Sequence, residues 1–195
     1  MPTPAPFLFG KLPAHGDFIA RGLSQSARRA WDDWATDRVR QMREEDGEAF
    51  EAAHDAAPPW RFVTEAGAFV EGWSAGALAP SIDSAGRRFL VVLGVQGLTA
   101  ARAAALGLSI AEALEQLIYQ AIGSALDADA VVAAIKGLAD DLELTSAPVA
   151  DGLDARLAVA GLWWAAHDPR PVFSATPPDQ ILKDGAVHSS WGGVP

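Results

Sequence analysis

The sequence contains no cysteine, which excludes disulfides and thiolate metal sites and is compatible with a reducing compartment. It also lacks a long apolar run. The densest one, residues 91–95, is far shorter than the roughly 18 residues that cross a bilayer. The proline-rich residues 1–6 have neither a charged start nor an apolar core. We therefore expect no signal peptide and no membrane insertion.

Positive charge is scarce as well. The chain has 15 basic and 25 acidic residues, which gives a formal net charge of −10. Such a surface repels nucleic acid and anionic lipid at long range, so we expect neither as a partner. Half of the residues are hydrophobic and 21% are charged, a composition typical of a globular protein. A length of 195 residues fits one domain with a full core.

Residues 7–23 form the most informative stretch. An apolar run over 7–12 predicts a buried strand, and Pro13 and Gly16 then interrupt it. A polar loop directly after a buried strand is a frequent place for a binding site. The loop is not a phosphate-binding loop, because it lacks that motif's first glycine and its Ser or Thr after the lysine. The polar residues gathered here are Lys11, His15, Asp17 and Arg21.

Further strands are predicted by short apolar or alternating segments. Residues 60–64 alternate large apolar side chains around Arg61. Residues 73–83 and 89–95 flank a turn at 84–88 and predict an antiparallel hairpin. The continuous apolar run in 89–95 is typical of a central strand that is buried on both faces. Shorter strands are predicted at 162–164 and 172–174.

Helical periodicity dominates three other segments. Residues 25–45 place Trp31 and Trp34 on one apolar side, with Ser24 or Ser26 as the N-cap, so both indoles are expected in the core. A short helix is predicted at 48–55. Ser109 and Glu112 have the spacing of a capping box, which predicts the start of a helix there.

Two helical segments follow, one beginning at Asp127 or Asp129 and a last turn or two at 177–183. Together these elements predict one α/β domain over residues 1–195. It is a sandwich with a mixed or mostly antiparallel sheet covered by helices on both sides. Residues 1–6 and about 185–195 are expected to be loose ends.

Three blocks of the sequence, in order, resemble a known family. The first contains Gly10-Lys11-Leu12-Pro13, Gly16-Asp17-Phe18 and Arg21-Gly22-Leu23. The second is Pro59-Trp60-Arg61-Phe62. The third, within 72–89, has the core Pro80-Ser81-Ile82-Asp83-Ser84-Ala85-Gly86-Arg87. These blocks resemble the TagF family of accessory proteins of bacterial type VI secretion. One departure is Arg88, where an aromatic or apolar residue is common in the family.

The resemblance implies a function as well as a fold. TagF-like proteins are post-translational repressors of type VI secretion and are thought to bind the forkhead-associated (Fha) scaffold protein of that system. The resemblance therefore implies an α/β sandwich in the cytoplasm that regulates assembly. Because the sequence also lacks a complete catalytic or metal signature, we expect no enzymatic activity and no cofactor. The partner that it implies is the forkhead-associated protein.

A small hydrolase or ligand-binding enzyme is the alternative. Ser81, Asp83, His15 and Asp17 supply the residue types of a catalytic triad. However, no Gly-x-Ser-x-Gly elbow surrounds Ser81, and short polar side chains at 81 and 83 commonly hydrogen-bond a turn. An enzyme would need a pocket at the loop 13–17 and the turn 80–87. The histidines are scattered and none is paired at a metal-ligand spacing, so no metal site is expected.

Two interpretations of the charged motif residues remain open. They bind a partner, or they form ion pairs that tie the first loop to the hairpin turn, because a charge buried there must be paired. Both interpretations predict that the loop 13–17 and the turn 80–87 lie together. The candidate set is Lys11, His15, Asp17, Arg21, Ser81, Asp83 and Arg87.

Overall fold

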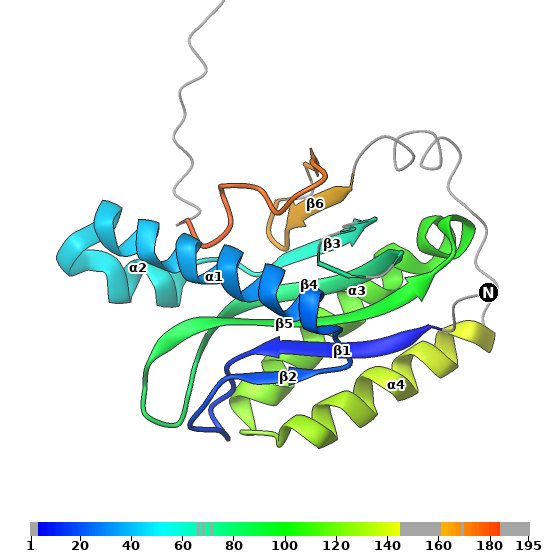
Figure 1. Ribbon diagram of the computed structural model, residues 1–195, viewed down its shortest axis with the longest axis horizontal. Helices are drawn as coiled ribbons and strands as arrows, with labels where there is room; N and C mark the ends of the chain where they lie inside the picture. Colours follow the sequence, from blue (N-terminus) through cyan, green and yellow to red (C-terminus); the bar gives the residue numbers. More distant parts are fainter. Residues whose placement is uncertain are drawn as a thin grey trace, which may run out of the picture.

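An antiparallel sheet of seven strands, with helices on both faces, forms the protein (Figure 1). This computed structural model describes residues 4–65, 67, 69–70, 72–144, 161–168 and 170–183. The strand order is β2-β1-β5-β4-β3-β6-β7, and every neighbouring pair is antiparallel. The predicted α/β sandwich is therefore confirmed, with an antiparallel rather than a mixed sheet among the described residues.

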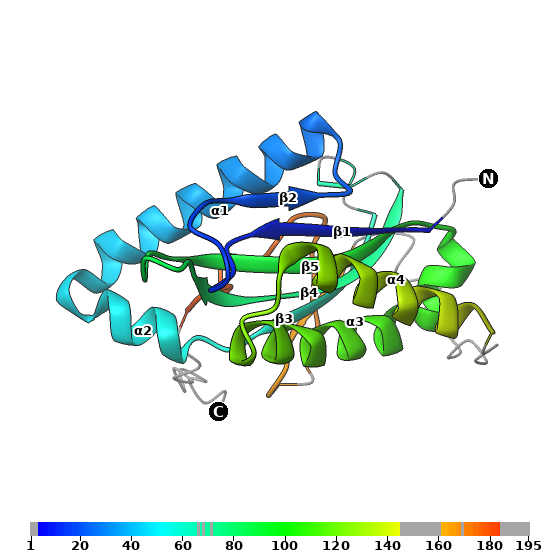
Figure 2. The same cartoon turned by 90° about the horizontal axis from the view of Figure 1, so that it is seen from below.

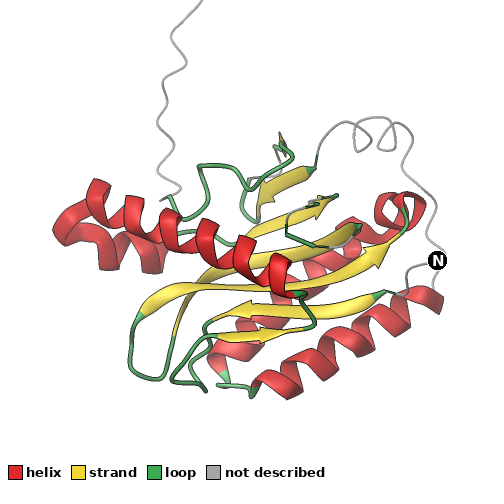
Figure 3. Cartoon of the chain, in the orientation of Figure 1, coloured by secondary structure: helices red, strands yellow, loops and turns green. Residues whose placement is uncertain are grey.

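The elements agree closely with the predicted segments over most of the chain (Figure 3). The strands are β1 (Ala5–Gly10), β2 (Ile19–Arg21), β3 (Trp60–Thr64), β4 (Trp73–Ile82), β5 (Arg88–Leu98), β6 (Leu162–Ala165) and β7 (Val172–Phe173). The helices are α1 (Gln25–Asp46), α2 (Phe50–Ala56), α3 (Ala100–Gly123) and α4 (Ala128–Leu144), with a 3-10 turn, η1 (Gly47–Ala49), between α1 and α2.

The central strand β5 separates two hydrophobic cores. Val91, Leu93 and Val95 face the core that α3 and α4 cover, whereas Leu90 and Val92 belong to the core beneath α1. Figure 2 shows α1 on one side of the strands and α3 and α4 on the other. Burial on both faces explains why this strand has a continuous apolar run instead of an alternating one.

Helix α3 packs very closely on the sheet through small residues. A Cβ atom at Gly107 would lie 2.6 Å from Cγ2 of Val63 on β3, so only glycine fits there without displacing the strand or the helix. Opposite the helix, β4 contributes Ala75, Ala77 and Ala79 to the same core. This close approach buries the middle of α3.

The predicted capping box at Ser109 is wrong. Helix α3 begins at Ala100, and its N-cap is Thr99, whose hydroxyl oxygen accepts a hydrogen bond from the backbone N–H of Arg102 at 3.2 Å. The alanine-rich residues before position 109 favour helix strongly, so the helix extends upstream through them. Glu112 instead forms an ion pair with Arg61 of β3, at 3.7 Å.

Helix α1 begins where the sequence predicts, because the side chain of Ser24 accepts a hydrogen bond from Ala27 at 3.2 Å. Trp31 is buried and its ring lies 4.7 Å from that of Phe69. Trp34 is only half-buried and packs edge-on against Trp31 at 5.7 Å. The expectation that both indoles lie in the core is therefore correct for Trp31 and only partly so for Trp34.

The two ends of the described chain both join the fold. Ala5 and Pro6 pair with Gln96 and Val95 of β5, so the expectation that residues 1–6 are loose is wrong for these two. Near the other end, Ile181 is buried and its carbonyl oxygen accepts a hydrogen bond from the buried guanidinium of Arg38 at 2.9 Å. The helical turn or two predicted at 177–183 is not formed, because residues 179–182 make non-helical turns, whereas 185–195 lie outside the described residues. None of the described helices is long and apolar enough to cross a membrane.

The different burial of the two tryptophans leads to a test of stability. Trp31→Ala should lower the free energy of unfolding by about 3–5 kcal/mol, the usual cost of truncating a buried aromatic side chain. Trp34→Ala should cost roughly half of that, because part of its ring already faces solvent. Chemical denaturation of both variants measures the difference. Equal losses would contradict the half-buried position of Trp34.

Candidate functional site

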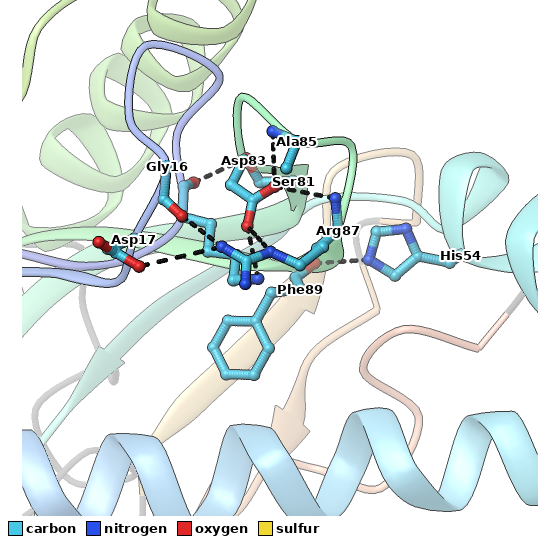
Figure 4. A network of polar contacts seen from close by, with 9 residues as sticks. Gly16, Asp17, His54, Ser81, Asp83, Ala85, Arg87 and Phe89 are labelled. Carbon is cyan, nitrogen blue, oxygen red and sulfur yellow. Dashed lines mark hydrogen bonds and ion pairs between the residues drawn. The ribbon is translucent and has the colours of Figure 1, made fainter.

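The loop after β1 and the turn between β4 and β5 lie together, as predicted. The backbone N–H of Ser84 donates to the carbonyl oxygen of His15 at 2.8 Å. The guanidinium of Arg87 donates through Nη2 to the carbonyl oxygen of Gly16 and lies 3.9 Å from the carboxylate of Asp17 (Figure 4). Two segments about 70 residues apart in sequence are thereby joined at one end of the sheet.

Asp83 is the centre of this junction and is only 1% exposed. Its Oδ2 accepts hydrogen bonds from Nζ of Lys11 at 2.8 Å and from Nε of Arg87 at 2.7 Å. Its Oδ1 accepts from the backbone N–H groups of Ala85 and Arg87, at 3.0 and 2.9 Å. Both oxygens are thus fully engaged, which is what a buried carboxylate requires.

The same contacts determine the acidity of this carboxyl group. The hydrogen bond from Lys11 contributes most and, with the bonds from Arg87, holds the pKa of Asp83 far below its usual value, although burial opposes the shift. The group is therefore ionised in the folded protein across the whole physiological range of pH. The ion-pair interpretation of the motif charges is correct for Lys11, Asp83 and Arg87.

Ser81 serves the same junction and is not arranged as a nucleophile. Its hydroxyl, which is buried, donates to the carbonyl oxygen of Lys11 at 2.8 Å and so ties β4 to the loop. The side chain of His15 instead contacts the start of α4, where its Nε2 accepts from the backbone N–H of Ala128 at 3.0 Å. The two residues therefore do not form the serine–histidine pair of a triad.

His15 and Arg21 connect the first block to α4. The imidazole of His15 satisfies a free N–H at the start of α4, and Arg21 pairs with Asp129 at 3.1 Å. Asp127 caps the same helix end by accepting from the N–H of Asp129 at 2.8 Å, so the predicted start of this helix is confirmed. Arg21 thus binds α4 and not the hairpin turn. Asp17 remains fully exposed.

Arg88, the departure from the family pattern, has a structural role of its own. It pairs with Asp55 at 2.8 Å and with Glu51 at 3.0 Å, both on α2. Its guanidinium lowers the pKa of the Asp55 carboxyl group. Next to it, the buried ring of His54 contacts the carbonyl oxygen of Phe89 (Figure 4). These contacts hold α2 against the first residues of β5.

Phe18 is a further residue of this site that the candidate set predicted from the sequence does not include. It is the aromatic side chain of the Gly-Asp-Phe triplet and is 47% exposed. Its ring stands edge-on to that of Phe89, with centroids 4.7 Å apart, and Nζ of Lys11 lies 4.9 Å from its centroid. The sequence does contain a signal for an exposed aromatic residue here. Phe18 is a large apolar residue directly after a Gly-Asp turn, outside any strand.

Two further features bear on an enzymatic interpretation: converging metal ligands and a pocket. Within the described ranges, no three His, Asp or Glu side chains converge as ligands. A small apolar depression does exist, but none of the candidate residues lines it. Its walls come from Pro4, Val95, Leu98, Arg102, Leu106, Ile110 and Ala139.

Comparisons with known proteins agree with the three sequence blocks. The family described as "TagF N-terminal domain, Type VI secretion system-associated" matches residues 8–138, about two thirds of the chain. The crystal structure of PA0076 from Pseudomonas aeruginosa PAO1 has a similar fold, with a TM-score of 0.67. The two sequences are 23% identical, and the similarity covers 98% of this chain and 100% of that one. No curated protein sequence matches the chain.

The junction at Asp83 predicts a pH-dependent stability. Asp83→Asn should lower the melting temperature at pH 7 by on the order of 10 °C, because two cations lose their counter-ion and an amide N–H₂ group would face one of them. The native pKa is depressed, so the carboxylate stabilises the fold above its unfolded pKa of about 3.9, and this contribution is lost as the pH falls below that value. The difference from the wild type should therefore shrink below about pH 4.

Thermal melts across pH 2–8 check this, on the scale set by that unfolded pKa. The matched control is Asp17→Asn, which changes an exposed carboxylate of the same loop and should melt like the wild type. A constant difference between wild type and Asp83→Asn at every pH would show that charge is not the cause.

Proposed function

Because the chain belongs to the TagF N-terminal domain family of type VI secretion system-associated proteins, we propose that it is a repressor of that system. It would act after translation, in the cytoplasm, by binding a forkhead-associated scaffold protein, and it would catalyse no reaction. The family match carries this proposal. Repression would follow from occupancy, since the bound scaffold could not promote assembly of the apparatus.

The contacts of the motif residues support a binding role over a catalytic one. The polar side chains of the junction hydrogen-bond to one another and to the backbone, as Ser81, Asp83 and Lys11 show. They form a rigid junction that presents neighbouring side chains, such as Asp17 and Arg87, at the surface. A rigid scaffold beneath exposed loop residues is the usual arrangement of a recognition surface.

The function is tested with the isolated proteins and in the host. Purified chain should bind the purified scaffold protein in isothermal titration calorimetry. Deleting its gene should raise secretion by the apparatus, and excess protein should suppress secretion. Ser81→Ala and His15→Ala variants that remain folded should still repress.

Two results would overturn the proposal. One is secretion that stays unchanged after both deletion and overexpression in a host with an active apparatus. The other is turnover of an ester, phosphate or peptide substrate that disappears in Ser81→Ala or His15→Ala.

Two arginines of the site should respond differently to charge reversal. Arg21 forms an exposed pair with Asp129, so Arg21→Glu should leave the melting temperature nearly unchanged. Any weaker scaffold binding by that variant then reports on the interface. Arg87→Glu should melt at a clearly lower temperature, because it places a carboxylate beside the buried Asp83. Melting and binding are measured on the same samples, and similar melting of the two variants would contradict this assignment.

A further inference from the structure

Phe18 is an exposed aromatic side chain that its surroundings hold in place. Its ring packs at 89° against Phe89, which is itself buried and lies 6.3 Å from Phe9 in the core beneath α1. The ammonium of Lys11 lies beside the same ring and is fixed by Asp83. One part of the ring is thus anchored to the core, while almost half of the residue faces solvent.

Arg87 contacts the two residues that precede Phe18 in the loop, and its guanidinium is incompletely used. The side chain of Arg87 is 58% exposed. Its Nε binds Asp83 and its Nη2 binds the carbonyl oxygen of Gly16. Its Nη1 has no hydrogen-bond partner in the described part of the chain. The exposed end of this guanidinium therefore has one donor group ready for an acceptor on another molecule.

The junction holds two cations for one buried carboxylate. The chain as a whole carries −10, yet Lys11 and Arg87 share the single buried carboxylate of Asp83 and leave one positive charge in excess. Asp17 offsets it only weakly, because its pair with Arg87 is long, at 3.9 Å, and exposed. A carboxylate on a partner would compete with Asp17 for the exposed end of the Arg87 guanidinium, where the existing ion pair is long and weak.

We propose that Phe18 is the anchor residue of the partner-binding surface and that it enters an apolar pocket on the partner. The rim of that pocket would carry a carboxylate that accepts from Nη1 of Arg87. A rigid aromatic ring loses little conformational freedom on binding, and aromatic and arginine side chains dominate the energetics of protein interfaces. This inference rests on the proposed function, because it takes the partner to be the scaffold protein.

Two other exposed residues with large apolar side chains, both on α3, make weaker anchors. Tyr119 of α3 has its hydroxyl bonded to the buried Glu115 at 3.0 Å, which accounts for its position. Leu108 of α3 is similarly exposed, at 43%, but lies on the opposite face of the sheet from α1. A single exposed leucine is ordinary on a protein surface. Leu108 is therefore a suitable control.

The experiment measures binding of Phe18→Ala, Phe18→Leu and Leu108→Ala to the purified scaffold protein by calorimetry. Phe18→Ala should weaken the affinity at least about tenfold, as removal of an interface anchor does. Phe18→Leu should be intermediate because it keeps apolar volume, and Leu108→Ala should bind like the wild type. Circular dichroism melts confirm that each variant is folded.

A second measurement uses only the wild-type protein, in case Phe18→Ala fails to fold. Hydroxyl-radical footprinting should show that the ring of Phe18 is modified in the free protein and protected in the complex. Unchanged affinity of a folded Phe18→Ala, or a ring that stays reactive in the complex, would overturn the anchor assignment and leave the repressor function standing. A wild-type chain that does not bind the scaffold would overturn both.

Discussion

The bridge from Lys11 to Asp83 is the interaction on which this end of the molecule depends. One buried carboxylate accepts from a lysine of the first loop, from an arginine of the hairpin turn and from two backbone N–H groups. Removing Asp83 would leave the buried ammonium of Lys11 unpaired, which is far more costly than never having buried the pair. The positions of Phe18, Ser81 and Arg87 all follow from this one point of attachment.

Much of the fold could be predicted because local patterns and tertiary packing agree. The limits of β3, the cap of α1 and the hairpin of β4 and β5 are set by alternation, by Ser24 and by a turn rich in small polar residues. The start of α3 was predicted wrongly, since Ser109 and Glu112 satisfy a local rule while the alanine-rich residues before them carry the helix upstream to its cap at Thr99. The close packing of Gly107 on Val63 could not be predicted, because a packing distance between distant segments leaves no periodic signal in the sequence.

The candidate site was predictable as a place but not as a set of contacts. The motif residues predicted that the loop and the turn lie together. In the structure they are joined by the hydrogen bond from Arg87 to the carbonyl oxygen of Gly16. Sequence could not show that His15 and Arg21 face α4, because their partners, Ala128 and Asp129, lie more than 100 residues away. Nor could the sequence show which part of the Phe18 ring is exposed to solvent, since that depends on how Phe89 packs against it.

The strand order has a consequence for how the chain is made. Apart from the three residues of β2, strand β1 pairs only with β5, and the Lys11–Asp83 contact spans 72 positions. During synthesis the apolar residues Phe7, Leu8 and Phe9 must therefore wait for roughly ninety residues to leave the ribosome before their partner strand exists. A newly made first strand is thus a natural client for a chaperone, and a fragment that ends before β5 has no route to the native sheet.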